Sequence, residues 1–306
     1  MCRVLMYLGE PILADDLLYK PDSSLIKQSY HARFMSRMHN LAGFGMAAWD
    51  KNSHDKEIPF IYKTAELPFY DANLKHLANK IKTDCLLAHV RGVPYSEHEV
   101  VAEQNVHPFI YSNCKLALAH NGNLMHFAKM KYDLLNYIDP AINRLIHGTT
   151  DSEWIYAIFM SQFKNRAVAP TLSETRQAIL QTLAILSKVR QKHKIKTASP
   201  VNLFITGGDY LVATRYVFNF GCFYDDFHST HLPNTYNSLW YTYGQEYRFH
   251  HNEYNMMAGD KRTSVIIASE PLTEDTTTWI EAPEYSLITA YIKNAEMKII
   301  TENIDI

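Results

Sequence analysis

The second residue of the chain is a cysteine that directly follows the initiator methionine, in MCRVLMYLG. If Met1 is removed, Cys2 becomes the N-terminal residue and carries a free α-amine beside its thiol. The reference pKa is about 8.5 for a thiol and about 7.7 to 8.0 for an α-amine, so the amine can accept the thiol proton near neutral pH. Cys2 would then be a nucleophile with its own base. Alternatively, Cys2 is a small buried residue that starts an edge strand, because buried cysteine is common.

Three further stretches carry the other groups that attack on an amide carbonyl requires: AHVRG at 88–92, LAHNGNL at 118–124 and GTTDSEW at 148–154. The side-chain amide of Asn121 and the backbone N–H of Gly122 could donate hydrogen bonds to a tetrahedral oxyanion. Arg91 could bind an α-carboxylate through two charge-assisted hydrogen bonds, and Asp151 could accept from an α-ammonium. Together these roles describe recognition of a glutamyl head group.

Each stretch also has a purely structural interpretation. Arg91 could be a solvated or ion-paired arginine at the end of a strand. Asn121-Gly122 is a strong signal for a hairpin turn. Thr150, with Glu153 three residues later, forms a capping box before an apolar helix. Taken one motif at a time, the residues alone leave both interpretations open.

The composition narrows the class of protein. The 306 residues include 30 basic and 32 acidic side chains, for a net charge of −2, and no block of like charge stands out. No electrostatic argument therefore favours nucleic acid or an anionic membrane, and a small neutral or zwitterionic substrate fits better. No run approaches the roughly 18 apolar residues of a membrane span, and nothing at the N-terminus reads as a signal peptide. We expect a cytoplasmic protein.

The cysteines and histidines give no sign of a metal or disulfide framework. Four cysteines (Cys2, Cys85, Cys114 and Cys222) are widely spread and lack C-x-x-C spacing. Cys85 and Cys114 lie in apolar runs and are predicted to be inert. The pairs His228/His231 and His250/His251 lack the carboxylate or cysteine ligands that would complete a metal site. We predict no metal and no cofactor.

The hydrophobic pattern predicts many short strands interrupted by helices. Apolar and aromatic runs predict strands before residue 122 and again after residue 200, with one short strand between 218 and 255. Helices are expected over 73–82, 125–137, 152–163 and 172–193, and Thr171 with Glu174 marks the start of the last one as a capping box. This order favours an α+β layered fold in one domain over 1–306. An irregular, aromatic-rich insertion around 218–255 is interpreted as a loop region that borders a pocket.

These motifs, in this order and spacing, resemble the class II glutamine amidotransferases, a family of N-terminal cysteine nucleophile hydrolases. The resemblance is strongest to the stand-alone branch that includes the ergothioneine-pathway amidohydrolase and the glutathione-degrading amidotransferase-like subunit of yeast. It covers most of the chain, and the stretches that carry it are MCRVLMYLGEP, SLIKQSY, GFGMAAW, LLAHVR, HPF, LAHNGNL, GTTDSEW and, more loosely, NLFITGGDYLVATRY and SVIIASEPLTEDTTTW.

The resemblance implies a fold and a role for each candidate residue. The fold would be a four-layer αββα sandwich. Cys2 would be the nucleophile and its amine the base, Asn121 and Gly122 would form the oxyanion hole, and Arg91 and Asp151 would bind the substrate's α-carboxylate and α-amine. The expected reaction is hydrolysis of a γ-glutamyl amide, in a γ-glutamyl peptide or amine or in glutamine, through a Cys2 thioester. No synthase domain follows, so a partner subunit could accept the released amine.

Two positions depart from the family pattern, and two alternative functions stay open. Ala42 stands where relatives usually carry aspartate. Pro94 stands where relatives usually carry a threonine that helps to hold the glutamyl carboxylate, and proline offers no donor there. A larger γ-glutamyl compound is therefore expected to bind better than glutamine. The alternatives are a glutaminase subunit that supplies ammonia to a separate synthetase, and a catalytically silent protein that binds a glutamyl ligand.

Overall fold

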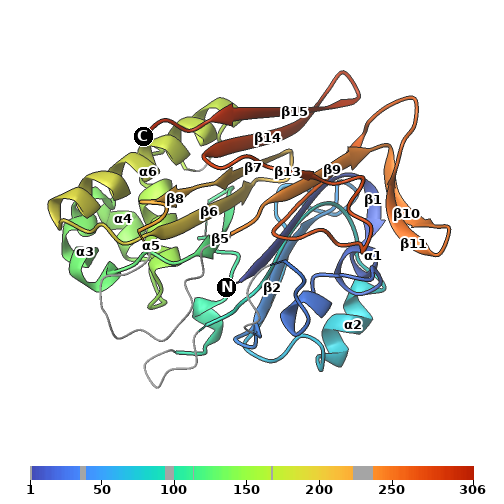
Figure 1. Ribbon diagram of the computed structural model, residues 1–306, viewed down its shortest axis with the longest axis horizontal. Coiled ribbons are helices and arrows are strands. Elements are labelled where there is room, and N and C mark those ends of the chain that lie inside the picture. The colour runs from blue at the N-terminus through green and yellow to red at the C-terminus, as the bar shows by residue number, and fades with distance from the viewer. Residues whose placement is uncertain (1, 35–38, 94–99, 113, 167, 223–236) are drawn as a thin grey trace.

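The computed structural model of the protein describes residues 2–34, 39–93, 100–112, 114–166, 168–222 and 237–306. Two antiparallel sheets pack face to face, with α1 and α2 outside one sheet and α3 to α6 outside the other (Figure 1). This arrangement confirms the predicted α+β fold with αββα layers.

The first sheet has the strand that follows Cys2 near its centre. Its spatial order is β13-β9-β12-β1-β4-β2-β3, and β1 runs antiparallel to both neighbours. Cys2 therefore precedes a central strand, and the alternative that it starts an edge strand is wrong. The strands are β1 (Arg3–Leu13), β2 (Phe44–Trp49), β3 (Phe60–Thr64), β4 (Lys82–Val90), β9 (Trp240–Gly244), β12 (Ser264–Ala268) and β13 (Ile280–Glu281).

The second sheet ends at the strand that carries the Asn-Gly pair. Its order is β15-β14-β7-β6-β5, with β8 paired to β6. Its strands are β5 (Ala117–Gly122), β6 (Ser199–Thr206), β7 (Tyr210–Arg215), β8 (Val217–Phe218), β14 (Ser286–Lys293) and β15 (Glu296–Asn303).

Four described helical regions lie where the hydrophobic pattern predicts them, with ends that differ by up to a few residues, whereas the short helices α1 and α4 were not predicted. The expected helices over 73–82, 125–137, 152–163 and 172–193 correspond to α2, α3 with η3, α5 and α6. The helices are α1 (Ala14–Leu18), α2 (Ala72–Ala78), α3 (Phe127–Leu134), α4 (Pro140–Asn143), α5 (Asp151–Met160) and α6 (Leu172–Lys192), with short 3₁₀ turns η1 (Lys27–Ser29), η2 (Glu103–Asn105) and η3 (Leu135–Tyr137).

Alternation along β1 explains why its start is fixed in place. Successive side chains of a strand point to opposite faces. Val4 and Met6 pack between the two sheets, whereas Leu5 and Tyr7 pack in the cluster that also contains residues of α1 and α2. Burial of both faces fixes the register of β1, because a shift of one residue would exchange the two sets.

The segment 218–255 is more regular than the sequence predicts. Beyond β9, it contains the hairpin of β10 (Glu246–His250) and β11 (Glu253–Met257), which pair antiparallel through five residue pairs. Tyr247, Tyr254 and Met256 of this hairpin pack into the cluster that covers the outside of the first sheet. Aromatic residues on alternate positions thus build a strand pair here, which corrects the predicted irregular insertion. Residues 223–236 lie outside the described part.

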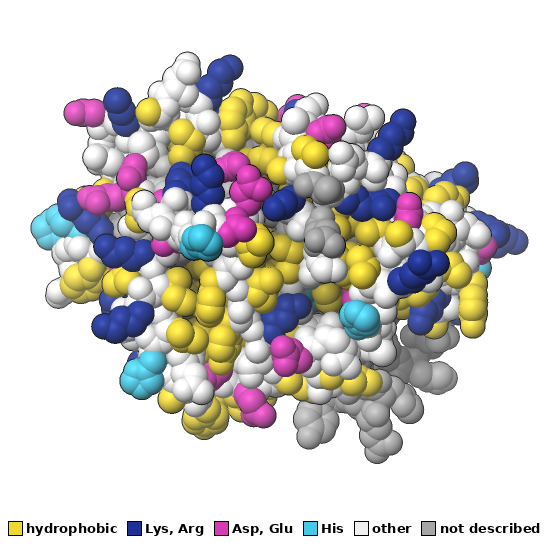
Figure 2. All heavy atoms as spheres, turned by 180° about the vertical axis from the view of Figure 1, so that it is seen from behind, with side chains coloured by type: hydrophobic (Ala, Val, Ile, Leu, Met, Phe, Trp, Pro, Cys, Tyr) yellow, Lys and Arg dark blue, Asp and Glu magenta, His cyan; other side chains and the backbone are white. Residues whose placement is uncertain are grey.

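The described helices and surface add two observations. None of the described helices combines the length and the apolar character needed to cross a membrane. On the face in Figure 2, basic and acidic side chains are interspersed without a large area of one sign, which agrees with the net charge of −2.

Candidate active site

A pocket of about 430 Å³ opens where β1 begins and where β4 and β5 end. Four of the five predicted site residues line it, and the fifth, Asn121, is fully buried beside Gly122. The lining residues are Cys2, Arg91, Gly92, Val93, His107, His120, Gly122, Asn123, Leu124, Met125, His126, Phe127, Thr149, Thr150, Asp151 and Ser152. None of the described residues of 218–255 is among them, so the interpretation of that segment as the border of this pocket finds no support there.

The thiol of Cys2 lies against the backbone of Gly92. The Gly92 N–H donates to Sγ at 3.4 Å, and Sγ lies 3.5 Å from the Gly92 carbonyl oxygen. The residue is 8% exposed, and it forms part of the pocket wall. The segment after β4 therefore positions the sulfur.

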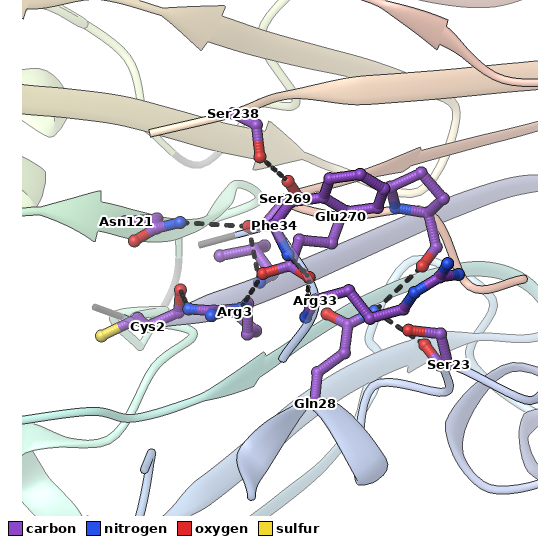
Figure 3. Close-up of polar contacts among 12 residues, drawn as sticks. Cys2, Arg3, Ser23, Gln28, Arg33, Phe34, Asn121, Ser238, Ser269 and Glu270 are labelled. Carbon is purple, nitrogen blue, oxygen red and sulfur yellow. Dashed lines mark hydrogen bonds and ion pairs between the residues drawn. The ribbon is translucent and has the colours of Figure 1, made fainter. Parts of the chain in front are cut away.

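A buried ion pair anchors the backbone behind the thiol (Figure 3). Arg3 Nε lies 2.8 Å from Glu270 Oε1, and both side chains are inaccessible to solvent. Arg3 Nη1 also donates to the Cys2 carbonyl oxygen at 3.1 Å. Burial lowers the pKa of Arg3, and the Glu270 carboxylate opposes that shift. The second Glu270 oxygen accepts the backbone N–H groups of Arg33 and Phe34 at 2.9 and 3.1 Å, which connects a third segment to the start of β1.

Asn121 and Gly122 are the last residues of β5, not a hairpin turn. They pair with Asn202 and Val201 of β6, which lies far away in sequence. A Cβ built on Gly122 would lie 1.9 Å from the Pro200 carbonyl oxygen, so only glycine fits beside that strand. The structural interpretation of Asn121-Gly122 as a turn is therefore wrong, and the end of β5 instead reaches the pocket.

Hydrogen bonds hold Asn121 at both its backbone and its side chain. Asn237 Nδ2 donates to the Asn121 carbonyl oxygen at 2.8 Å. Asn121 Nδ2 donates to Ser269 Oγ at 3.1 Å, and Ser269 Oγ also accepts the Val4 N–H at 3.0 Å. One hydroxyl thus joins the oxyanion-hole candidate to the strand that follows Cys2.

Arg91 follows the last residue of β4 and points its guanidinium at the pocket wall. Its Nη1 donates to the Val100 carbonyl oxygen at 3.0 Å, and Asn105 Nδ2 donates to the same oxygen at 3.1 Å. The Arg91 N–H donates to the Gly43 carbonyl oxygen, and the Ala42 N–H donates to the Arg91 carbonyl oxygen. The backbone bonds around Ala42 are therefore formed despite the missing aspartate. Pro94 lies outside the described residues.

Asp151 is the first residue of α5 and faces the same pocket. Its Oδ2 accepts the Leu124 N–H at 2.6 Å, and its Oδ1 accepts the Ser152 N–H at 2.8 Å and the Ser152 hydroxyl at 3.2 Å. A carboxylate suits this place, because a helix N-terminus carries partial positive charge. Two oxygens with about four lone pairs in all leave acceptor capacity for an ammonium group.

Three buried histidines adjoin the pocket, and we did not single them out from the sequence. His120 Nδ1 lies 2.8 Å from Ser152 Oγ. Neither ring nitrogen of His107 has a hydrogen-bond partner among the described residues, and its ring centroid lies 4.1 Å from that of His89. Burial lowers the pKa of all three, so they are neutral at neutral pH. Their only sequence signal was their place inside the stretches AHVRG, HPF and LAHNGNL.

Within the part of the chain that the structure describes, the remaining cysteines and histidines build no comparable site. Burial raises the pKa of the Cys85 thiol to about 12 and also raises that of Cys114, whereas Cys222 is exposed. Within the described ranges, no three His, Cys, Asp or Glu side chains are grouped as metal ligands. His250 and His251 end the β10 strand and begin its turn, and His228 and His231 lie outside the described residues.

Comparison with known proteins adds independent findings. A family model described as class II glutamine amidotransferases matches residues 22–291. The probable glutamine amidotransferase DUG3 of Saccharomyces cerevisiae is 30% identical over 307 residues, which cover 94% of this chain and 81% of the yeast protein. An uncharacterised protein of Methanocaldococcus jannaschii is 30% identical over 91 residues, or 29% of this chain and 22% of that protein.

Solved structures of similar fold have much lower sequence identity. A class II glutamine aminotransferase domain protein of Silicibacter pomeroyi superimposes with a TM-score of 0.62 at 19% identity, over the full length of both chains. The glutamine phosphoribosylpyrophosphate amidotransferase of B. subtilis gives a TM-score of 0.57 at 19% identity, over all of this chain and 50% of that one. These two likenesses concern the fold.

Proposed function

The chain belongs to the class II glutamine amidotransferases, a family of amide-hydrolysing enzymes, and from that premise we propose that it hydrolyses γ-glutamyl amides through a thioester on Cys2 and releases glutamate. The observation that carries the proposal is the meeting of Cys2, Arg91, Gly122 and Asp151 in one pocket. They come from four separate segments of the chain, and each supplies a different group that the reaction needs.

The proposed reaction has two halves. The Cys2 α-amine takes the thiol proton, and the thiolate attacks the γ-carbonyl carbon, while Asn121 and Gly122 donate to the oxyanion. Collapse of the tetrahedral intermediate breaks the C–N bond, and the leaving nitrogen takes the proton from the Cys2 ammonium. Water then attacks the thioester carbon with the amine again as base. The C–S bond breaks, and glutamate leaves with the thiol restored.

Arg91 and Asp151 would hold the glutamyl end, and other residues must select what lies beyond the γ-amide. Leu124, Met125 and Phe127 give the pocket an apolar side, and its volume of about 430 Å³ lies within the range of sites for drug-sized ligands. This supports a γ-glutamyl peptide or amine over free glutamine. All four cysteines are free, which fits a proposed location in the reducing cytoplasm.

The first experiment asks whether Cys2 is the nucleophile. Intact mass of the native protein should show loss of Met1, and a diazo-ketone analogue of glutamine should label Cys2 first, as read by peptide mapping. The control cysteine is the exposed Cys222. Labelling by the diazo-ketone should persist in the Cys222→Ser variant and vanish in the Cys2→Ser variant. Retention of Met1, or first labelling elsewhere, would overturn the mechanism and favour the silent glutamyl-binding protein.

The second experiment asks which amide is cleaved. Release of glutamate is measured with glutamine, γ-glutamyl dipeptides and γ-glutamyl amines on one preparation. We expect kcat/KM for a γ-glutamyl peptide or amine to exceed that for glutamine by at least about tenfold, roughly 1.4 kcal/mol of transition-state binding. If glutamine is the best substrate, the chain acts as a glutaminase that supplies ammonia, and a partner synthetase should be sought.

A further inference from the structure

In the hydrogen-bond network around Asn121 and Ser269, one donor and one acceptor have no partner within the described part of the chain. Both side chains are fully buried. With Nδ2 facing Ser269, the hydroxyl oxygen accepts two N–H groups, from Val4 and from Asn121. A hydroxyl also carries one proton of its own to donate, and Asn121 Oδ1 has no hydrogen-bond partner among the described residues. A buried donor and a buried acceptor are thus both unused, which is costly.

A half-turn of the Asn121 amide satisfies the groups on the Ser269 side and leaves the two amide N–H groups on the other side as the unpaired donors. The oxygen and nitrogen of an amide side chain have nearly the same shape, so the hydrogen-bond network decides which faces which partner. With Oδ1 facing Ser269, the hydroxyl proton is donated to Oδ1, and the hydroxyl oxygen still accepts the Val4 N–H. Both unused groups on that side then have a partner.

The same half-turn directs the amide N–H₂ toward the nucleophile. Figure 3 shows one end of the Asn121 amide turned toward Ser269 and the other end turned to the side on which the Cys2 thiol lies. In the turned orientation this second end is Nδ2, so its N–H groups face the side of the Cys2 sulfur, where the oxyanion would form.

We propose that Ser269 is a positioning residue whose hydroxyl donates to Asn121 Oδ1 and thereby aims the Asn121 N–H₂ group into the oxyanion hole. The proposal rests on the proposed function, because it assigns how one of its two oxyanion donors is oriented. Ser269 touches no reacting atom. It acts through Asn121, and its bond from the Val4 N–H fixes it relative to the strand that carries Cys2.

The surroundings of Ser269 make it a rigid reference point. Its own N–H donates to the Val4 carbonyl oxygen at 2.9 Å, so β1 and the end of β12 hold it from both sides. Its carbonyl oxygen accepts the Ser238 hydroxyl at 2.6 Å. A serine whose backbone is held at two points and whose hydroxyl accepts the Val4 N–H can favour one of the two amide orientations, which a mobile surface serine could not do.

The test compares two reactions of Cys2, of which only one needs an oxyanion donor. Iodoacetamide alkylates the thiolate by displacement at carbon and forms no oxyanion, whereas a diazo-ketone analogue of glutamine places its ketone oxygen where the scissile carbonyl oxygen would lie. In Ser269→Ala we expect the diazo-ketone to label Cys2 at least about tenfold more slowly, and kcat for amide hydrolysis to fall by about 100-fold. The iodoacetamide rate should stay within about twofold.

Three variants separate positioning from loss of structure. Ser29→Ala removes an equally buried hydroxyl that donates to the Ile26 carbonyl oxygen and contacts neither Ser269 nor Asn121, and it should leave both labelling rates unchanged. Ser269→Thr keeps the hydroxyl and should restore the diazo-ketone rate. In an Asn121→Ala background, Ser269→Ala should cause no further loss, because a residue that acts only through Asn121 has nothing left to position.

The outcomes distinguish this inference from the proposed function. If the wild-type protein is not labelled at Cys2 by the diazo-ketone, the proposed function fails. If it is labelled and Ser269→Ala is labelled equally fast, the positioning role is wrong. Equal slowing of both reagents in Ser269→Ala would also overturn it, because Ser269 would then act on the thiol or on folding rather than on the oxyanion donor.

Discussion

The N-termini of α5 and α6 begin with the same signature, Thr-x-x-Glu, and the structure uses it differently in each. At α6, Thr171 Oγ1 accepts the Glu174 N–H, and the Glu174 carboxylate accepts the Thr171 N–H at 2.8 Å, so the capping box is complete. At α5, Thr150 accepts the Glu153 N–H at 3.3 Å, but the Glu153 carboxylate accepts the N–H groups of His147 and Gly148 instead.

The difference follows from where each helix begins. Glu174 is exposed and has only its own helix to contact, whereas Glu153 is buried against the loop that leads into the site. By holding His147 and Gly148, Glu153 fixes the approach to Thr149, Thr150 and Asp151. The N-terminus of α6 carries a local helix cap, whereas the N-terminus of α5 also forms part of the pocket wall. The sequence predicts the threonine cap at the N-termini of both helices. It predicts the partner of the Glu174 carboxylate correctly, but not that of the Glu153 carboxylate.

The largest effect should come from the first residue of α5. Asp151→Asn removes the charge that would accept the substrate's α-ammonium, and a hydrogen bond to a charged group contributes about 1.5–3 kcal/mol, so we expect kcat/KM to fall about 10- to 150-fold. Glutaramate, which is glutamine without its α-amine, should be hydrolysed equally by both proteins. The matched change at α6, Leu172→Asn, should leave kcat/KM unchanged. A similar loss with glutaramate would show that Asp151 acts on the fold and not on the ammonium.

Replacement of either capping threonine by alanine should lower the stability of the protein by a similar amount, but the two replacements should lower its activity unequally. Replacing a capping threonine by alanine costs about 1 kcal/mol, so Thr150→Ala and Thr171→Ala should lower the free energy of unfolding in urea by similar amounts. Only Thr150→Ala should also lower kcat/KM, because it loosens the turn that carries Asp151. If Thr171→Ala reduces activity as much, the distinction between a local cap and a site cap is wrong.

The smallest expected effect concerns how Glu153 and Glu174 change the free energy of unfolding as a function of pH. Burial raises the pKa of Glu153, whereas hydrogen bonds from the Thr171 side chain and backbone lower that of Glu174. A raised folded-state pKa means that stability falls as pH rises from the unfolded value of about 4.3 through the folded one. A lowered pKa means that stability is present above about 4.3 and is lost as pH falls through the folded value.

Urea unfolding between about pH 3 and 7 checks these opposite signs. The stability advantage of the wild-type protein over Glu174→Gln should grow with rising pH, and its advantage over Glu153→Gln should shrink. Parallel trends in the two variants would mean that the two carboxylates sit in equivalent environments, and the contrast between α5 and α6 would not hold.

Local patterns in the sequence predicted much of the fold. Alternating and continuous apolar runs marked β1, β4 and β5, and 3.6-residue periodicity with Thr171 and Glu174 marked α6. These features depend on neighbours a few residues apart, so the sequence shows them directly. The motifs also indicated the candidate site residues, because the type and order of residues suggest the chemistry that each could perform. These candidates are Cys2, Asn121, Gly122, Arg91 and Asp151.

Only the tertiary structure decided how those residues meet. Asn121-Gly122 satisfies a turn and a strand end equally well, and its pairing with Asn202 and Val201 of a strand about 80 residues later makes it a strand end. The only sequence signal of Ser269 and Glu270 was their place inside the stretch SVIIASEPLTEDTTTW. Their partners Val4 and Arg3 lie more than 260 residues away, and residue types along a chain do not encode which distant groups burial will pair. The sequence by itself thus indicated the five candidate site residues, and only the fold shows the buried contacts that orient them.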